Sequence, residues 1–383
     1  MYVKKCRKGH EYYIEVTLIN ILKMKKVLLF LSIALLVSCS DCKEDGQAGR
    51  LEVRNVIFMI GDGMGPAQVY AGLTHNGGHL TLEEFPFVGL VKTYSANRYI
   101  TDSAAGGTAL ATGNKTNNGM IGVTPDTVAV TSSLMEAHKA GMTTGIVVTS
   151  PVTHATPASF YAHQPSREMY EDIALDLEKS GIDVFIGGGR AHFEKRSDSV
   201  DVSTRMREAG YNIVYNEEEL AAVQDGKVGA LLADIDMPRA SERGDYLPSA
   251  VRKAISLLDG GGKGFFLMVE GSQIDYRCHG NEAVPMAEEM IDFDRAVKAA
   301  LDFAKEDGHT LVVVTADHET GGVTLTDGSY ETGEIECHFS TGDHTGTFVP
   351  MFAFGPGAEQ FTGIVDNTSF KDKFVELLGI SVE

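Results

Sequence analysis

Carboxylate and histidine side chains, which can bind metal ions, directly follow three strongly apolar runs of the 383-residue chain. The runs are Val56–Ile60, Phe265–Val269 and Leu311–Thr315, and the side chains that follow them are Asp62, Glu270, Asp275, His279, Asp317 and His318. Carboxylates mixed with imidazoles suit zinc, whereas sets of oxygen atoms suit magnesium. Carboxylates crowded together would repel one another without cations between them. One such aspartate alone is typical of a helix N-cap or a turn, but its recurrence after three runs predicts a metal centre.

The elements that must position these residues are strands of an α/β fold. Six apolar runs are continuous rather than alternating, which is typical of strands buried on both faces. They are Val56–Ile60, Gly145–Thr149, Asp183–Ile186, Phe265–Val269, Leu311–Thr315 and Pro350–Phe354. Helical signals between them predict one α/β domain on a mostly parallel sheet with helices on both faces. Ligands of such sheets bind beyond the carboxyl ends of the strands. Residues 191–245 are polar and acidic and predict a peripheral insert.

Two of the helices are predicted from particular residues. Ser133 and Glu136 have the spacing of a capping box, and Gly141 would end that helix. A second helix carries an apolar stripe with a spacing of three or four residues. The stripe consists of Met290, Phe293, Val297, Ala300 and Ala304.

A candidate nucleophile, Ser103, follows Asp102 and precedes a run of small, helix-compatible residues. This order predicts a helix N-terminus at Ser103, where the dipole and free N–H groups favour an anion such as phosphate. Either residue could instead merely cap that helix, and the segment is not a G-x-S-x-G elbow. The Gly61–Gly65 turn does not complete a dinucleotide fingerprint, because Pro66 stands where that motif needs a small residue.

Charge and the N-terminal segment indicate where the protein acts. With a formal net charge of −20, the protein lacks the excess of basic residues that is typical of a nucleic-acid binder. The apolar run Val27–Val37 is shorter than the ~20 residues that span a bilayer and predicts a signal peptide over residues 1–38, with Met24 as an alternative start. Leu36–Cys39 resembles a bacterial lipobox, which predicts a lipid on Cys39, a polar tether over residues 39–51 and a catalytic domain over 52–383. In an oxidising compartment Cys278 and Cys337 could pair, which the sequence leaves open.

Seven motifs, in this order, resemble those of the alkaline phosphatase family. They are the Gly-Asp-Gly-Met turn at Asp62, Thr101–Ala105, His154–Ala158 with Arg167, Gly187–Arg190, Glu270–His279, Thr315–His318 and His344–Gly346. They extend over roughly residues 52–360. The resemblance implies an alkaline phosphatase-like fold with a central sheet of about ten strands, two zinc ions and one magnesium ion. It also implies hydrolysis of phosphate monoesters, and together with the lipobox-like sequence it predicts an exported lipoprotein of the periplasm or outer membrane.

The resemblance further implies a role for each matching residue. The implied ligands are Asp275, His279 and His344 for one zinc, Asp62, Asp317 and His318 for the other, and Asp62, Thr156 and Glu270 for magnesium. Ser103 would be the nucleophile and form a phosphoserine. Arg167 would hold phosphate oxygens with its bidentate fork, and Asp102 would orient that arginine.

Two residues depart from the family pattern, and alternatives exist within the wider superfamily. His154, where many bacterial members carry Asp, would weaken magnesium binding or admit zinc. Tyr276 replaces a Lys or His and removes one positive partner for phosphate. Sulfatases use a modified Cys or Ser in a setting that differs from Asp102-Ser103-Ala104, and phosphodiesterases of this group commonly use Thr.

A binding protein without turnover would have lost a ligand or the nucleophile, and none of the expected residues is missing from the sequence. The expected partners are therefore small phosphomonoesters and a membrane reached through the lipid anchor. A second copy of the chain in a homodimer is a further expected partner.

Overall fold

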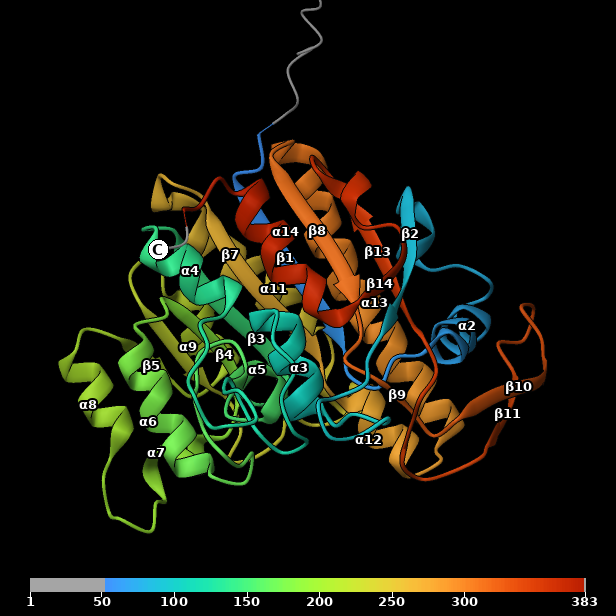
Figure 1. Cartoon of the computed structure of the whole chain (residues 1–383), viewed down its shortest axis with the longest axis horizontal. Helices are drawn as coiled ribbons and strands as arrows, with labels where there is room; N and C mark the ends of the chain where they lie inside the picture. The colour runs from blue at the N-terminus through green and yellow to red at the C-terminus, as the bar shows by residue number, and fades with distance from the viewer. Residues whose placement is uncertain (1–51, 382–383) are drawn as a thin grey trace, which may run out of the picture. The chain divides into compact units, whose positions relative to one another are not determined.

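All six predicted runs form strands of one ten-stranded sheet in the computed structural model, which describes residues 52–381 (Figure 1). Across the sheet the strands are β14 (Gly363–Asp366), β2 (Phe87–Lys92), β13 (Val349–Phe354), β8 (Thr310–Thr315), β1 (Asn55–Gly61), β7 (Phe265–Gly271), β3 (Thr143–Pro151), β4 (Val184–Gly188), β6 (Val228–Leu231) and β5 (Asn212–Val214). Among these described strands, β13 alone runs antiparallel to its neighbours. The predicted fold class, with its mostly parallel sheet, is confirmed.

Helices cover both faces of this sheet. On one face, in front of the sheet in Figure 1, lie α3 (Ser103–Thr112), α4 (Ser133–Lys139) and α14 (Phe370–Leu377). On the other face α11 (Tyr246–Leu258) and α13 (Ala283–Asp307) pack against each other and the strands. The remaining helices are α2 (Pro66–His75), α5 (Ala155–Ala158), α6 (Tyr170–Ser180), α7 (Arg190–Glu194), α8 (Val202–Glu208), α9 (Glu217–Ala222), α10 (Ala240–Arg243) and α12 (Gln273–His279).

Two small antiparallel sheets complete the described elements. One consists of β10 (Val323–Gly328) and β11 (Ile335–Phe339), and the other of β9 (Glu319–Thr320) and β12 (His344–Thr345). Short 3₁₀ turns cover Thr81–Glu84, Asp259–Gly261, Ala358–Gln360 and Asn367–Ser369.

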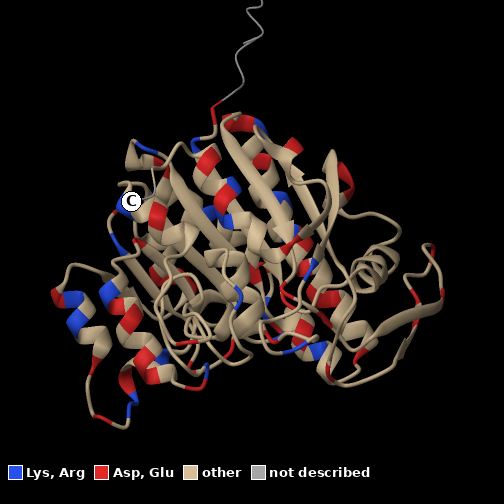
Figure 2. Ribbon diagram, viewed as in Figure 1, with Lys and Arg blue, Asp and Glu red and all other residues tan. Residues whose placement is uncertain are grey.

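The central strands are apolar because both of their faces are covered. Every residue of β1, β7 and β8 is buried. On one face Phe58 of β1 contacts Phe374 of α14, with ring centroids 5.0 Å apart. On the other face Phe265 of β7 contacts Phe303 of α13 at 5.8 Å. Figure 2 shows the consequence: charged residues colour the helices and loops, while the central strands are almost entirely uncoloured.

The two helices predicted from particular residues both exist, with one correction at a cap. The apolar stripe of α13 is buried at every predicted position. In α4, however, the N-cap is Ser132 rather than Ser133, since the Ser132 Oγ accepts a hydrogen bond from the Met135 amide at 3.1 Å. Gly141 follows the helix end with φ of +84°, a left-handed conformation that favours glycine.

Four strands of the central sheet were not predicted, and all four lie at or near its edges. Two of them, β2 and β14, expose side chains such as Val88 and Ile364, so they are not buried on both faces as the predicted strands are. The other two, β5 and β6, lie within the expected peripheral insert of residues 191–245. That segment lies at one edge of the molecule's sheet, but it also extends the sheet by two strands.

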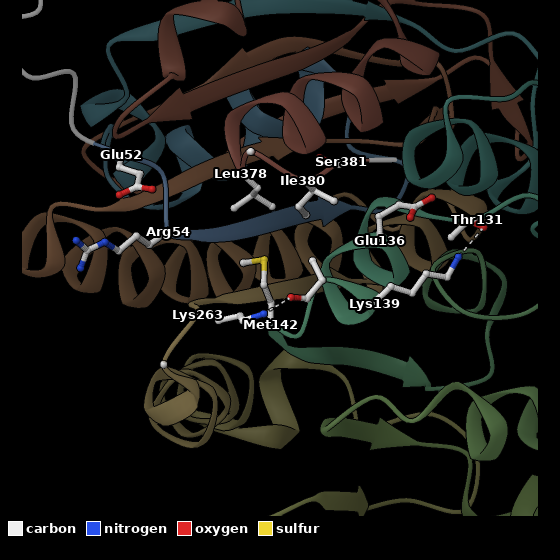
Figure 3. A pocket seen from close by; sticks show the side chains of 13 residues that line it. Glu52, Arg54, Thr131, Glu136, Lys139, Met142, Lys263, Leu378, Ile380 and Ser381 are labelled. Carbon is white, nitrogen blue, oxygen red and sulfur yellow. Dashed lines mark hydrogen bonds between the residues drawn. The ribbon is translucent and has the colours of Figure 1, made fainter. Parts of the chain in front are cut away.

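A polar cleft lies where β1, β3 and β7 begin, at the end of the sheet opposite the predicted ligands (Figure 3). Arg54, Met142 and Lys263 line it just before these strands.

Cys278 and Cys337 are free thiols. The predicted signal peptide, the lipid site at Cys39 and the tether lie outside the described residues. In the described part of the chain, no helix combines the length and apolar character needed to cross a membrane.

A buried ion pair joins the 191–245 segment to α13. The guanidinium of Arg243, on α10, donates to Glu289 at 2.6 Å and to Asp292 at 2.9 Å. All three side chains are at most 2% exposed. Asp292 also meets Arg295 at 3.3 Å, but the Arg295 side chain is 51% exposed. The two arginines therefore contact the same carboxylate from very different environments.

We expect Arg243→Ala to reduce the free energy of unfolding by about 3–5 kcal/mol, because it leaves buried Glu289 without a cation and Asp292 with only the half-exposed Arg295. Arg295→Ala is the matched control, with an expected cost below about 1 kcal/mol because the Arg295 guanidinium is half exposed. Urea unfolding of both variants at fixed metal concentration measures the difference. Equal losses would show that burial of the Arg243 pair has no special weight.

Candidate active site

The register of the central strands brings the predicted acidic groups to one level. β1 lies between β7 and β8 and runs parallel to both, so Ile60 stands opposite Glu270 on one side and Thr315 on the other. Asp62 follows directly after β1, and its amide donates to the carbonyl of Gly271 at 3.2 Å. Residues that lie more than 200 positions apart in the chain therefore meet at the carboxyl edge of the sheet.

The turn after β1 can approach its neighbours only because it contains Gly63. This glycine has φ of +69°, and a Cβ at this position would lie 3.0 Å from the Asp275 Cβ. Its amide donates to Asp317 Oδ1 at 3.2 Å. A left-handed conformation and a close approach thus coincide at one residue beside Asp62, and both require glycine.

The first candidate metal group contains Asp275, His279 and His344, whose ligand atoms lie within 4.8 Å of one another. His279 Nε2 is 3.2 Å from Asp275 Oδ2 and also 3.2 Å from His344 Nε2. The Nδ1 atoms of the two histidines face carbonyl oxygens, that of Gly342 at 2.8 Å and that of Thr101 at 2.9 Å. An Nδ1 that donates to a carbonyl leaves the lone pair on Nε2, so both imidazoles present ligand atoms to the same space.

The second group contains Asp62, Asp317 and His318, which are all fully buried. His318 Nε2 lies 3.2 Å from Asp317 Oδ2 and 3.5 Å from Asp62 Oδ1. The same nitrogen lies 3.1 Å from the Oγ of Ser103. The predicted nucleophile therefore stands directly beside this group.

The third group contains Asp62, His154 and Glu270, so Asp62 belongs to two groups. Glu270 Oε2 accepts hydrogen bonds from Ser272 at 2.6 Å and Ser150 at 3.3 Å. Its other oxygen has no partner. Such an acceptor is available to a cation.

Unpartnered polar atoms show that the second and third groups fit metal ions. Buried polar atoms without a hydrogen bond are rare in folded proteins and require an explanation. At this site they are both carboxylate oxygens of Asp62, Asp317 Oδ2, Glu270 Oε1, the hydroxyl of Thr156 and Nδ1 of His154. Oxygen atoms and imidazole nitrogens of this kind are the ligands that zinc and magnesium use.

The protonation of the carboxyls reflects the same crowding. Burial, followed by the charges of Asp317 and Asp275, raises the pKa of Asp62 well above its ordinary value. Burial and the Asp275 charge raise the pKa of Asp317 to about 6, and burial raises that of Glu270 to about 7. Burial also lowers the pKa of His318 well below its ordinary range. Without cations, burial and crowding shift each of these groups toward its neutral form.

The other end of the site begins with Asp102, the N-cap of α3. Asp102 Oδ1 accepts from the Ala105 amide at 3.0 Å, and Oδ2 accepts from the Gly119 amide at 2.9 Å. Oδ2 also meets Arg167 Nη1 at 3.2 Å, while Arg167 Nη2 lies 3.2 Å from His154 Nε2. Asp102 therefore both caps the helix and contacts the arginine, so the two interpretations of this residue are compatible.

Three residues around the site were not predicted from the sequence. Glu319 and Thr320 directly follow His318, and the hydroxyl of Thr320 donates to Asp275. Their position next to a predicted ligand in the sequence could have indicated that they lie near the site. Asp236 accepts a hydrogen bond from the Tyr276 hydroxyl at 3.1 Å across 40 positions of the chain. No local pattern could have revealed that contact.

A buried carboxylate and imidazole centre beside a serine at a helix N-terminus defines a metal-dependent hydrolase that acts on phosphoryl groups. Comparison with known proteins agrees. The alkaline phosphatase family model matches residues 53–337. Alkaline phosphatase 4 of Bacillus subtilis is 36% identical over 404 residues, covering 83% of this chain and 87% of that protein.

Solved structures extend the comparison. The alkaline phosphatase of the Antarctic bacterium TAB5 is 41% identical with a TM-score of 0.81, covering 86% of this chain and 99% of that one. A histidine-to-glutamate mutant of the TAB5 enzyme, described with Mg bound in its M3 site, matches at a TM-score of 0.82, with the same identity and coverage. The chain belongs to the alkaline phosphatase family, and its activity is the hydrolysis of phosphate monoesters.

We expect removal of metals to lower the melting temperature, and to lower it more as the pH rises from about 6.5 to about 8. In the metal-free protein Glu270, with a pKa of about 7, and His279, with a pKa of about 9, hold protons more tightly than the unfolded chain does. Their stabilising contribution is therefore lost as the pH rises toward those values. His154 and His318 have lowered pKa values and act on stability below this window.

Bound cations would replace these protons, so the melting temperature of the metal-loaded protein should not fall over this pH range. Melting curves of chelator-treated and reloaded protein at the two pH values measure the difference. A constant gap between the two forms would contradict the electrostatic account.

Proposed function

We propose that this chain hydrolyses phosphate monoesters by transferring the phosphoryl group first to Ser103 and then to water, with two zinc ions and one magnesium ion bound. One observation carries the proposal. Ser103 begins α3, is buried, and places its Oγ 3.1 Å from His318 Nε2 beside the unpartnered carboxylate of Asp62. A hydroxyl at this point combines a helix N-terminus that favours anions with a group of side chains that suits a cation.

The three groups of side chains are assigned by their donor atoms. Two groups mix imidazoles with carboxylates, which suits zinc: Asp275, His279 and His344 for one ion, and Asp62, Asp317 and His318 for the other. Asp62, Glu270 and Thr156 supply oxygen atoms, which suit magnesium, and His154 at the same place would weaken magnesium or admit zinc. A pair of zinc ions, when bound, stabilises the attacking and leaving oxygens of an in-line displacement.

The side chains of the protein perform the remaining tasks. The Ser103 Oγ forms a bond to phosphorus while the bond from phosphorus to the alcohol oxygen breaks, and the alcohol leaves with a proton. Arg167, which contacts Asp102 and His154, would bind two oxygens of the phosphoryl group with its bidentate fork. Water then breaks the Ser103–phosphorus bond and releases phosphate. Because these contacts address the phosphoryl group, we expect a broad range of alcohols to be accepted.

Two proposals concern the rest of the molecule. The lipobox-like sequence that ends at Cys39 supports export and a lipid anchor, which would keep the enzyme in the periplasm or at the outer membrane. The domain arrangement proposed with it is a signal peptide over 1–38, a tether over 39–51 and the catalytic domain over 52–383.

We expect Ser103→Ala to lower turnover of an aryl phosphate by several powers of ten while the metal content is retained, because six zinc ligands come from other residues. Arg167→Ala should cost less, about 1.5–3 kcal/mol of charge-assisted hydrogen bonding. Steady-state kinetics with metal analysis gives the order, and acid quenching with peptide mapping locates phosphate on Ser103. Near-normal turnover of Ser103→Ala, or phosphate on another residue, would refute the mechanism.

We expect Cys39→Ser to move the protein from the membrane fraction to the soluble fraction, because no lipid can then be attached. Fractionation of the wild-type and variant proteins measures this. The proposal fails if membrane association is unchanged and the mature N-terminus begins well past Cys39.

A further inference from the structure

Glu319 is a buried carboxylate that takes no part in the three metal groups. Its side chain is 2% exposed and accepts four hydrogen bonds. Oε1 accepts from Gln68 Nε2 at 2.7 Å and from the Val323 amide at 3.1 Å, while Oε2 accepts from the Gly322 amide at 3.2 Å and from the Thr345 hydroxyl. Among the described residues no lysine or arginine pairs with it. Burying a carboxylate without a cation destabilises the folded state, unless well-oriented hydrogen bonds from neutral donors offset the loss of water.

These donors connect Glu319 to the segments that carry metal ligands. Glu319 directly follows His318, and in the small β9–β12 sheet it stands opposite Thr345. His344 stands opposite Thr320 in the same ladder. Successive side chains of a strand point to opposite faces, so the contact of Thr345 with Glu319 directs His344 to the other face, where Asp275 and His279 lie.

The same carboxylate side chain also fills the space beneath the Asp62 turn. A Cβ on Gly65 would lie 2.4 Å from the Glu319 Cγ, so this turn and the side chain are in direct contact. Gln68, two residues into α2, additionally donates to the Thr320 carbonyl at 2.7 Å and approaches the Sγ of Cys278 at 3.7 Å. Cys278 precedes His279 on α12. The network therefore reaches every segment that supplies a ligand to the first and second metal groups. Its contact with a ligand side chain is made by Thr320, whose hydroxyl donates to Asp275.

We propose that Glu319 is a positioning residue for the group of Asp275, His279 and His344. By holding Thr345, it fixes the strand on which His344 lies, so that the His344 Nε2 is aimed at this group before any cation binds. The inference rests on the proposed function to the extent that it treats this group as a zinc site. The competing role is purely structural, in which Glu319 only stabilises the turn at Gly321 and Gly322.

Thr345→Val is the sharpest variant, because it removes one hydroxyl donor and keeps the shape of the side chain. Glu319→Ala would remove the acceptor that four hydrogen-bond donors share and endanger folding. Thr345→Ser restores the hydroxyl. Thr326→Val is the matched control, since Thr326 makes the same kind of bond to Glu336, at 2.9 Å, on the β10–β11 hairpin outside the site.

The measurement is zinc affinity, by competition with a chelator, together with the absorption spectrum of the Co²⁺-loaded protein. For Thr345→Val we expect one zinc equivalent to bind about 10–100-fold more weakly and the Co²⁺ bands of that equivalent to change. Thr345→Ser and Thr326→Val should bind zinc like the wild type. Neither readout depends on catalysis.

Unchanged zinc affinity in Thr345→Val would overturn the inference. If the melting temperature of its metal-free form were also lower than that of the wild type, the result would assign Glu319 the purely structural role. Wild-type protein that binds no zinc would instead overturn the proposed function, so the two failures are distinguishable.

Discussion

Carboxylates with unpartnered oxygen atoms are buried together where three adjacent strands end, and their mutual repulsion is the constraint on which this structure depends. Asp62 carries the heaviest share, since both of its oxygens lack a hydrogen bond and it belongs to two metal groups. Such a cluster can be kept in place only by a rigid frame that was stabilised elsewhere. The fully buried strands β1, β7 and β8, packed between two layers of helices, supply that frame.

The parts of the site that are not on central strands are held by hydrogen bonds from outside the metal groups. Backbone carbonyls of Thr101 and Gly342 orient His344 and His279. Asp102 joins the start of α3 to Arg167. These contacts hold a short strand and a loop arginine at the distances given above. The site is thus fixed by hydrogen bonds outside the sheet as well as by the central strands.

Two positions near Arg167, His154 and Tyr276, depart from the pattern expected of the family. His154 contacts Arg167 through one nitrogen and faces the third metal group through the other. Tyr276 donates its hydroxyl to Asp236 and lies edge-on to His154, with ring centroids 5.9 Å apart. A neutral aromatic ring therefore occupies a place where the family resemblance implies a Lys or His, and its hydroxyl donates to a carboxylate.

The sequence by itself determined the buried strands and the chemistry at their ends, because an apolar run and the residue that follows it are neighbours in the chain. It also carried the order of motifs from which the family, the fold and the candidate ligands were predicted. Only the tertiary structure decided that Ser132 caps α4, that residues 191–245 extend the sheet, and that Glu319 and Asp236 contact Gln68 and Tyr276 near the site. Those outcomes depend on contacts between residues distant in the chain or on competition between adjacent caps. Such contacts are set by packing, which leaves no local pattern in the sequence.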